Sequence, residues 1–406
     1  MRAAARADAG TDLLVSRNAA ELRRTVIDWR RDIHSNPELS GQEMSTAKLA
    51  AYQLRRLGME VTTGVGGNGL VGVLHGSAAG AGKVVALRAD MDALPIKEAV
   101  EMPFASKVRG VYQGQPVDIM PACGHDGHTA ILMGVAEVLT RMCAQFAGTV
   151  KFLFQPAEEG EAGGAKRRPR PDIVFGLHLA AGLPTGMIGY RPGVAMASAD
   201  TCHLDVFGRQ SHAGGGCGPH RRLGADHPRT ADHRLASARP GGESGGDHRG
   251  LDPRRQPREH HLGPSADAGH GARLQRGRAR RGEIAHGEDT SAIASASGAQ
   301  AEVRFDGASY GVTANDPDLT AHMQTTLSRA AYGNTLELHP IFGSEEFGEF
   351  AKEAPEPFFF VGVTPADQDM RQAAPNHSSG FTMGEKAIEV GVLALSMLAV
   401  DYLRGQ

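Results

Sequence analysis

The first part of the chain alternates hydrophobic and polar residues at helical spacing. Apolar positions recur with the period of an amphipathic helix through AAELRRTVIDWRRDIH and again through MSTAKLAAYQLRRLG. This pattern predicts helix from about Ala19 to Leu57. A break is expected at the Asn36–Pro37 pair, because proline disfavours helix in the residue before it. Gly58 stands where the second helix is expected to end.

Short apolar runs farther along the chain predict buried strands. They are Val71–Leu74, Val84–Leu87, Val150–Phe154, Ile173–Phe175 and Phe358–Val361. Helical patterns such as Thr129–Met142 separate several of them, and strands that alternate with helices form mostly parallel sheets covered on both faces. The pattern therefore predicts an α/β fold with a mostly parallel sheet flanked by helices.

Polar motifs directly follow three of these predicted strands. RADMDALP (88–95) follows the second run, QPAEEGE (155–161) follows the third, and GLHL (176–179) follows the fourth. Ligands of open α/β sheets bind outside the carboxyl ends of the strands. We therefore expect these motifs to meet at one edge of one sheet.

The motif CGHDGH (Cys123–His128) concentrates a thiol, two imidazoles and a carboxylate in one turn before a predicted helix. Thiolate and imidazole are ligands that suit zinc and other borderline transition metals. The motif therefore indicates a metal site. Taken alone, it is also compatible with a helix start that happens to carry a cysteine.

Other candidate groups are acidic pairs and single histidines. Glu158 and Glu159 are adjacent just past a predicted strand, so one carboxylate could bind metal while the other moves protons. The two aspartates of RADMDALP lie on one side of an extended segment. Taken alone, such acidic pairs are more often solvated loops, and single histidines such as those of GLHL and NHSS are more often structural residues than ligands.

Together these motifs resemble the M20 peptidase and amidohydrolase family. ACGHDGHTA, FQPAEEGE, FGLH, GRQSHA, ANDPDLT, GSEEF and NHSSGF occur in the family's order from about Trp29 to Leu403, outside a middle stretch. The similarity is to its branch of hippurate, N-acyl-amino-acid and auxin-conjugate hydrolases. It implies a zinc-exopeptidase-like catalytic domain with an inserted, smaller α+β lid domain.

The resemblance also implies the site residues and their roles. The implied metal ligands, with Cys123 bridging two divalent cations (zinc or manganese), are Cys123, His125, Glu159, His178 and His377. Glu158 matches the general base, and Asp92 resembles a carboxylate that orients a site group. His212, in GRQSHA, matches a histidine that reaches the partner's site in a homodimer and stabilises the oxyanion. The implied reaction is hydrolysis of N-acyl amino acids by a metal-activated water.

Composition narrows the functional class. The 406 residues are 41% hydrophobic and 22% charged, typical of a globular protein, and the formal net charge of -3 disfavours a general nucleic-acid binder. No apolar run is long enough to span a membrane, and the N-terminus lacks the apolar region of a secretory signal. The 4 cysteines lack disulfide spacing. We therefore expect a cytoplasmic enzyme with a small-molecule substrate and no nucleic-acid or membrane partner.

The stretch between Phe207 and Val303 differs from the rest of the chain. It contains no Val, Phe, Tyr, Trp, Met, Lys or Asn, and its part 214–288 holds fourteen Arg and eight His. This composition predicts neither strand nor packed core. We interpret 214–288 as disordered, or as the product of a reading-frame shift in GC-rich DNA. The predicted domains are a catalytic domain in two parts, 1–195 and 309–406, and a disrupted lid and dimerisation domain, 196–308.

Two further interpretations arise from this segment. With a damaged lid, the chain would bind metal through intact ligands yet lack activity, because positioning and water exclusion supply much of the rate. Alternatively, the arginines bind nucleic acid. Against that alternative, nine acidic residues accompany the fourteen arginines of 214–288, and no Phe, Tyr or Trp is there to stack on bases. Hydrolysis of N-acyl amino acids is the main prediction.

Overall fold

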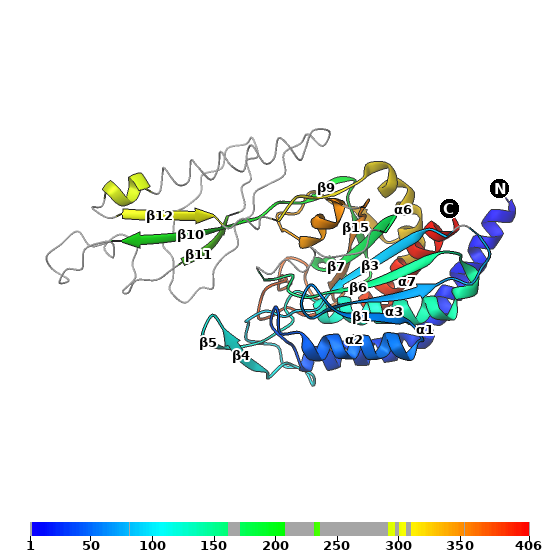
Figure 1. The fold of residues 1–406 in the computed structure, drawn as a ribbon, viewed down its shortest axis with the longest axis horizontal. Helices are drawn as coiled ribbons and strands as arrows, with labels where there is room; N and C mark the ends of the chain where they lie inside the picture. Colours follow the sequence, from blue (N-terminus) through cyan, green and yellow to red (C-terminus); the bar gives the residue numbers. More distant parts are fainter. Residues whose placement is uncertain are drawn as a thin grey trace. The chain divides into compact units, whose positions relative to one another are not determined.

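The computed structural model of the chain describes most of its residues, which form two compact units labelled by element in Figure 1. The described residues are 2–80, 82–160, 171–207, 231–235, 291–296, 300–305, 310–352 and 354–405. Unit 1 comprises Met1–Ala195, Ala314–His339 and Glu346–Gln406. Unit 2 comprises Met196–Thr313 and Pro340–Glu345.

Unit 1 is built on an 8-stranded sheet. Its strands, in order across the sheet, are β1 (Glu60–Val65), β2 (Gly69–His75), β6 (Thr149–Gln155), β3 (Val84–Asp90), β7 (Ile173–Pro184), β15 (Phe358–Thr364), β8 (Ile188–Tyr190) and β14 (Thr335–Glu337). The central strands β6, β3, β7 and β15 are parallel neighbours. β1–β2, β2–β6 and β15–β8 pair antiparallel, and β8–β14 pair parallel. This mixed, mostly parallel sheet confirms the predicted fold class.

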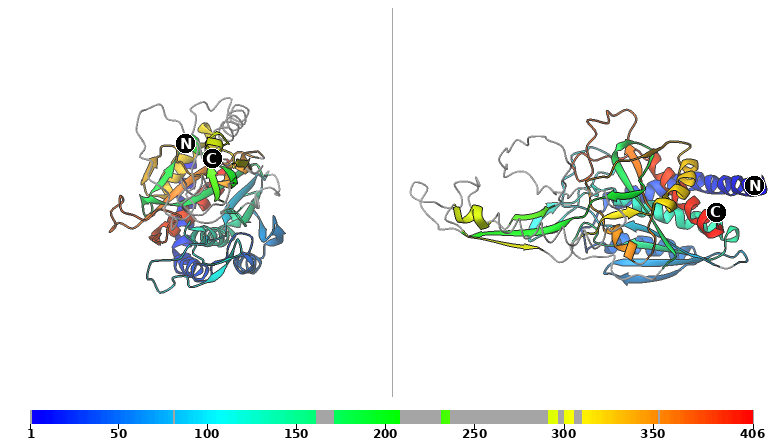
Figure 2. Two further views of the ribbon diagram at one scale, coloured as in Figure 1. Left: turned by 90° about the vertical axis from the view of Figure 1, so that its left-hand side faces the viewer. Right: turned by 90° about the horizontal axis from the view of Figure 1, so that it is seen from above.

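Helices pack on this sheet and on one another. They are α1 (Arg2–Ser35), α2 (Met44–Arg56), α3 (His125–Arg141), α6 (Pro317–Ala330) and α7 (Lys386–Arg404). α1, α3 and α7 contact each other, and the start of α1 projects beyond the sheet (Figure 2). Gly134 of α3 permits the close approach, since a Cβ there would lie 2.9 Å from Val26 of α1 and 3.1 Å from Val392 of α7. Apolar side chains such as Leu87 and Phe152 fill the core between these helices and the sheet.

All five predicted strands form, but three continue into the motifs that were expected to follow them. β3 extends through Asp90, β6 through Gln155, and β7 to Pro184. His178 therefore lies within β7, whereas the sequence placed it beyond the strand end. The cause is β15, which pairs with β7 in parallel and places Phe360 opposite His178 and Val361 opposite Leu179.

Unit 2 contains a 3-stranded antiparallel sheet, in which β10 (Asp200–Phe207) lies between β11 (Ala231–Leu235) and β12 (Gln300–Phe305). β11 falls inside the stretch in which no strand was predicted, so that prediction is wrong for these residues. The strand pairs through its main chain, and such pairing needs no apolar side chain. Apart from β11, the segment interpreted as disordered or frame-shifted, 214–288, lies outside the described residues.

Shorter elements complete the described parts of the chain. They are the hairpin of β4 (Arg109–Tyr112) and β5 (Gln115–Asp118), the pair of β9 (Gly193–Met196) and β13 (Thr313–Asn315), the 3-10 helices η1 (Cys143–Gln145) and η3 (Glu346–Lys352), and a helical turn at 291–296. Among the helices of the described residues, none combines the length and the apolar character that a membrane crossing requires.

Candidate metal centre

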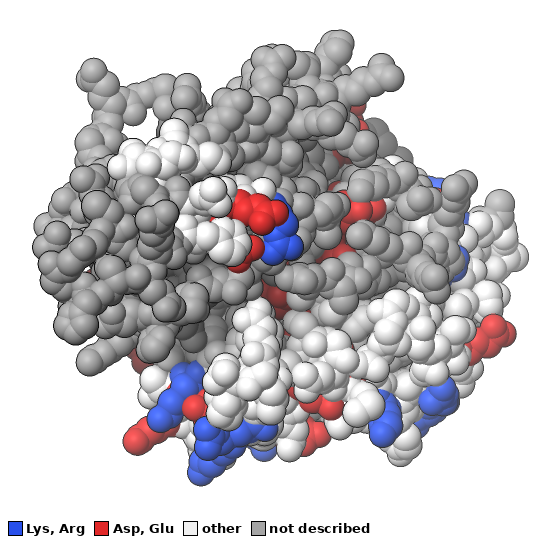
Figure 3. All heavy atoms as spheres, turned by 60° about the vertical axis from the view of Figure 1, so that its left-hand side comes forward, with Lys and Arg blue, Asp and Glu red and all other residues white. Residues whose placement is uncertain are grey.

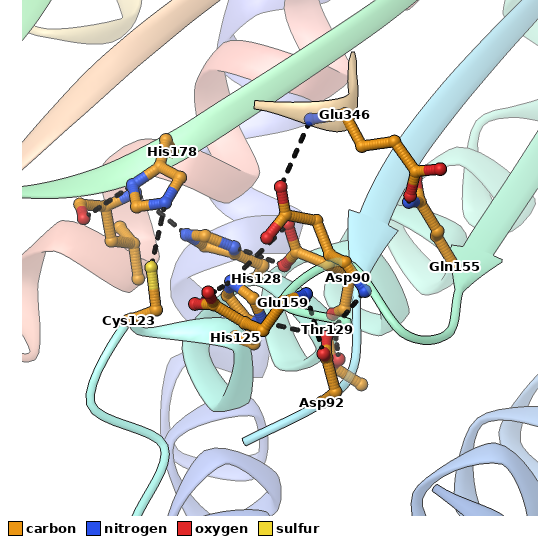
Figure 4. Close-up of polar contacts among 12 residues, drawn as sticks. Asp90, Asp92, Cys123, His125, His128, Thr129, Gln155, Glu159, His178 and Glu346 are labelled. Carbon is orange, nitrogen blue, oxygen red and sulfur yellow. Dashed lines mark hydrogen bonds and ion pairs between the residues drawn. The ribbon is translucent and has the colours of Figure 1, made fainter. Parts of the chain in front are cut away.

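The predicted ligands lie together in unit 1, and Figure 4 shows most of them. They come from the start of α3, the loop after β6, the middle of β7 and the loop between β15 and α7, which carry Cys123 with His125, Glu159, His178 and His377, respectively. Gly124 has a φ of 94°, a left-handed conformation that glycine adopts without strain. This turn immediately before α3 allows the residues on both sides of Gly124 to face one cluster.

Cys123 is shared by two groups of potential ligand atoms. In one group its Sγ lies 3.2 Å from Nε2 of His178, and His125 completes the group. In the other group, Nε2 of His377 lies 3.1 Å from the same Sγ and 3.0 Å from Oε1 of Glu159. Atoms bound to one zinc ion stand about 3 to 4 Å apart at ordinary zinc–ligand distances. Each group can therefore hold one ion, with Cys123 common to both.

His125 is oriented from behind by Asp92. The Nδ1 of His125 lies 3.2 Å from Oδ1 of Asp92, an arrangement that metal-ligating histidines commonly show. Its buried Nε2 has no hydrogen-bond partner among the residues that the structure describes, and the carboxylates of Asp90 and Glu159 are 3.7 and 3.9 Å away. A buried nitrogen without a hydrogen bond is costly, and a cation at Nε2 would satisfy it.

The second histidine of CGHDGH has both ring nitrogens engaged. Nδ1 of His128 lies 2.6 Å from Oδ1 of Asp90, and its Nε2 accepts a hydrogen bond from the N–H of Leu179 at 2.8 Å. Nδ1 therefore carries the proton. The carbonyl of Leu179 in turn accepts a hydrogen bond from Nδ1 of His178 at 2.9 Å, which leaves Nε2 of His178 directed at Cys123. The sequence offered two imidazoles in this motif, and these contacts separate the potential ligand from the residue that supports it.

The surroundings of the Cys123 thiol favour a cation. Burial raises the pKa of this thiol well above its usual range, and the charges of Glu159 and Glu158 raise it further. A buried thiol beside carboxylates becomes a thiolate only when positive charge balances it. The donor set therefore fits a site for divalent cations.

The pKa values of two histidines of the cluster, His125 and His178, are shifted in opposite directions. Burial lowers the pKa of His178 well below its usual range, and neighbouring His128 adds to this effect. Burial also disfavours the charged form of His125, but the carboxylates of Asp90 and Asp92 outweigh it and raise the pKa of His125 to about 10. His178 is therefore neutral, the form in which imidazole binds a metal, and the carboxylates around His125 supply negative charge for cations.

Glu158 is held by residues that the sequence did not identify. Its Oε1 accepts a hydrogen bond from the N–H of Glu346 at 3.1 Å. The side chain of Glu346 accepts a hydrogen bond from Gln155, whose Oε1 accepts from Nε of Arg88 at 2.9 Å. All three supporting residues are buried. A signal for two of them was available, because Arg88 and Gln155 are polar residues within otherwise apolar strand patterns.

Asp92 and His212 complete the predicted site. Asp92 is buried, and its Oδ2 accepts hydrogen bonds from Oγ of Ser40 at 2.5 Å and from the N–H of Glu159 at 2.9 Å. It thus contacts both a potential ligand side chain, His125, and the backbone of another. His212 lies outside the described residues, so its role stays a prediction.

The surface of the described residues carries charges of both signs. On the face drawn in Figure 3, Lys and Arg side chains lie mainly along the lower margin and are interspersed with Asp and Glu. Basic stripes that bind nucleic acid present clustered Lys and Arg along one face or helix. This part of the surface is of mixed charge, and the expectation of no nucleic-acid partner stays a prediction.

Comparison with known proteins adds independent observations. Residues 86–401 match the sequence model of peptidase family M20/M25/M40. The chain is 35% identical to thermostable carboxypeptidase 2 of Saccharolobus solfataricus, over 94% of this chain and 96% of that protein. It is 38% identical to an N-acyl-L-amino acid amidohydrolase of Geobacillus stearothermophilus, over 52% of this chain and 55% of that protein. A solved Bacillus subtilis structure, described as a dinuclear metal-binding peptidase from the M20 family, is 25% identical and matches with a TM-score of 0.64 over 95% of this chain and 99% of that chain.

Proposed function

The chain belongs to peptidase family M20/M25/M40 and is a metal-dependent amidohydrolase, and we propose that it hydrolyses the amide bond of N-acyl amino acids. The observation that carries this proposal is the arrangement of Glu158 beside the potential ligands, since Glu158, His125 and Glu159 offer atoms within 4.8 Å of one another. A proton-accepting carboxylate next to a metal centre is what hydrolysis of an amide by water requires. The relative named N-acyl-L-amino acid amidohydrolase supports the choice of substrate class.

We infer that two divalent ions, zinc or manganese, are held at this centre. The residues that would hold them are Cys123, His125, Glu159, His178 and His377. When bound, such ions lower the pKa of water and withdraw charge from a carbonyl oxygen. The thiolate and imidazoles suit zinc, and a carboxylate also suits manganese. The relative described as a dinuclear metal-binding peptidase supports the number of ions.

Glu158 would move the protons of the reaction. Its carboxylate accepts a proton from the attacking water and later delivers it to the leaving amine nitrogen. The hydrogen bond from the N–H of Glu346 fixes the orientation of that carboxylate before substrate binds. At 8% exposed, Glu158 is largely shielded from water, which strengthens its electrostatic interactions. We propose that His212 of a partner subunit stabilises the oxyanion, as the family resemblance implies.

The test replaces Glu158 by glutamine, which keeps the shape of the side chain and removes its ability to accept the proton. We expect kcat on N-acetyl and N-benzoyl amino acids to fall by about 10²–10⁴-fold, the usual contribution of a general base. Metal content, measured by elemental analysis, should stay at the parent's value. Glu101→Gln, at an exposed position, is the matched control and should keep the parent's kcat. A Glu158→Gln enzyme as fast as the parent would refute the proposed base.

A second substrate class has its own support. The relative named carboxypeptidase matches almost the whole chain, which favours peptides cleaved at their carboxyl-terminal residue. Both classes present an amide bond next to a free α-carboxylate. Comparing kcat/KM on N-acetyl amino acids with kcat/KM on N-blocked dipeptides separates them. Higher kcat/KM on the dipeptides would replace the first proposal by carboxypeptidase activity.

We propose that residues 196–308 form the lid and dimerisation domain, in a cytoplasmic enzyme. Light scattering of the purified chain checks the dimer, because a monomer at assay concentration would contradict it.

The reading-frame hypothesis for 214–288 is decided by sequencing the DNA across Ser211–Thr290. A continuous frame that encodes the present text would remove that hypothesis. A chain that binds two ions but hydrolyses neither substrate class would instead support the inactive, metal-binding alternative.

A further inference from the structure

The buried carboxylates of Glu43 and Asp92 accept hydrogen bonds from the backbone of the loop that carries the proposed base, Glu158. Oε1 of Glu43 accepts a hydrogen bond from the N–H of Ala157 at 2.8 Å. Asp92 accepts the next two, from the N–H of Glu158 at 3.2 Å and of Glu159 at 2.9 Å. Three successive N–H groups, covering the base and one potential ligand, therefore point at carboxylates. Asp92 also contacts His125 and so orients a potential ligand as well as the loop. Glu43 makes no described contact with a ligand side chain.

Glu43 is placed for this contact although its position suggests another role. It is the N-cap residue of α2, where acidic side chains usually accept hydrogen bonds from the first turn of their own helix. Its side chain makes no such bond. Glu38 accepts instead from the N–H groups of Ser45 and Thr46, at 2.9 Å each. The carboxylate of Glu43 is thereby turned away from α2 and toward the loop after β6.

The cost of burying this carboxylate argues for a specific purpose. Glu43 is 0% exposed, and burial raises its pKa, as does the neighbouring charge of Asp92. Its stabilising partners are the N–H of Gly41 at 2.6 Å, the N–H of Ala157, and Nδ2 of Asn68 at 3.2 Å. A buried acceptor with three donors is satisfied, but an apolar side chain would fill the same space without the desolvation.

The loop needs the support because its backbone is in an unfavourable conformation. Ala157 has a φ of 53°, the left-handed region that residues with a Cβ rarely adopt. Non-glycine residues keep such conformations when the surrounding structure holds them there, and they concentrate at functional sites. The loop also packs tightly on the segment before Glu43, since a Cβ at Gly160 would lie 2.9 Å from Cβ of Ser40.

We propose that Glu43 is a positioning residue of the catalytic centre, which holds Ala157 in its left-handed conformation and thereby aims Glu158 and Glu159 at the bound ions. The proposal rests on the proposed function for its effect on turnover. Without the acceptor at Glu43, the backbone at Ala157 relaxes toward an ordinary conformation and rotates the two following residues. A displacement of about 1 Å at the base is enough to reduce the rate by about 10²-fold.

The experiment compares three replacements that separate reach from charge. Glu43→Gln keeps an acceptor oxygen at the same reach and removes the charge, so kcat should stay within about threefold of the parent. Glu43→Asp keeps the charge and withdraws the oxygens by one methylene, and Glu43→Ala removes the acceptor. Both should lower kcat by about 10–100-fold, with KM changed less than about threefold. If Glu43→Asp kept activity and Glu43→Gln lost it, the role would be electrostatic and the proposal would fall.

A second substitution tests the mechanism through the loop itself. Glycine adopts a positive φ without steric cost, so Ala157→Gly should remove part of the need for the acceptor. In the Glu43→Ala background it should raise kcat by about fivefold or more, and by clearly less in the parent. Additive effects of the two substitutions would contradict the coupling. Gln42→Ala, at the exposed position next to Glu43, is the control expected to leave kcat unchanged.

Readouts other than turnover keep this proposal separate from the proposed function. Hydrogen exchange of the peptide 152–160, followed by mass spectrometry, should be slow in the parent and in Glu43→Gln and faster in Glu43→Asp and Glu43→Ala. The absorption spectrum of the Co²⁺-loaded protein should shift in the last two only, because Glu159 moves. A parent that hydrolyses neither substrate class would refute the proposed function, while exchange and spectra still decide the role of Glu43. If hydrogen exchange and the Co²⁺ spectrum of Glu43→Ala matched those of the parent, the proposed positioning role of Glu43 would be overturned.

Discussion

The sheets of the two units differ in how far their described side chains are buried. In unit 1, β15 is buried along its whole length, and β3 along all but its first residue. In unit 2, Phe207 and Ile293 are 56% and 69% exposed, and the large apolar core cluster draws, among the described residues, on unit 1 alone. None of the side chains that the structure describes in the sheet of unit 2 is buried. A centre whose atoms must stay about 3 Å apart instead rests on strands fixed by close packing.

The largest difference between the units is expected from matched phenylalanine truncations. Phe359→Ala removes a fully buried ring from β15 and should lower the free energy of unfolding by about 3–5 kcal/mol, because it leaves a cavity. Phe207→Ala, on β10, should change it by less than about 0.5 kcal/mol. Urea unfolding followed by circular dichroism and by the fluorescence of Trp29 measures both. Equal effects would show that unit 2 has a core of its own.

Ion pairs should show the same contrast at a smaller scale. Nε of Arg30 lies 2.7 Å from Oδ2 of Asp126, and the two side chains are 2% and 0% exposed. Asp126→Asn leaves Arg30 as a buried, poorly balanced charge and should cost about 3 kcal/mol. Asp205→Asn breaks a pair with Arg304 that is 24% and 59% exposed, which should cost about 0–1 kcal/mol. The urea concentrations at the midpoints of unfolding measure both losses of stability. A loss above about 2 kcal/mol for Asp205→Asn would contradict the expected difference between the two ion pairs.

The smallest expected effect concerns pH. Burial lowers the pKa of His34, but hydrogen bonds to Asp126 and Glu98 outweigh it, so the pKa is raised above 6.5. A raised pKa means that protonated His34 stabilises the fold fully below pH 6.5, and that this contribution is lost as pH rises through the folded-state pKa. His34→Gln should therefore destabilise more at pH 6 than at pH 9, by about 1.5 kcal/mol, the value of a hydrogen bond to a charged group. An equal loss of stability at the two pH values would contradict a protonated, stabilising His34.

Much of the fold of unit 1 could be predicted because its signal is local. Short apolar runs marked the five central strands, and a helical period marked α2 and α3. The strand ends could not be predicted, because β7 is prolonged by its pairing with β15, from residues far away in sequence. β8 and β14 have 3 residues each and carry too short a pattern to recognise. α1 begins at Arg2 and not near Ala19.

The residues of the candidate centre also differ in how far the sequence could predict them. Residue types and spacing indicated a metal site at CGHDGH, because metal chemistry restricts which side chains can serve. The full ligand set, with His178 and His377, came from the resemblance to a known family, and the structure brings those residues together. The supporting residues gave a weaker signal, since their roles depend on contacts between distant segments. Glu43 contacts Ala157 across 114 residues, and Gln155 contacts Glu346 across 191. Nothing in the local pattern around Glu43 distinguishes it from an ordinary first residue of a helix.

One contact of the centre has a consequence for how this chain can vary. Cys123 and His377 are 254 residues apart in sequence, and their side chains lie 3.1 Å apart. The entropy lost when a flexible chain closes such a loop grows only with the logarithm of its length, so doubling the loop adds about 0.6 kcal/mol. The free energy needed to bring Cys123 and His377 together therefore depends only weakly on the length of the chain between them. Insertions, deletions or replacements in the parts of that chain that carry neither a ligand nor a strand of the central sheet can accumulate over generations while Cys123 and His377 still meet.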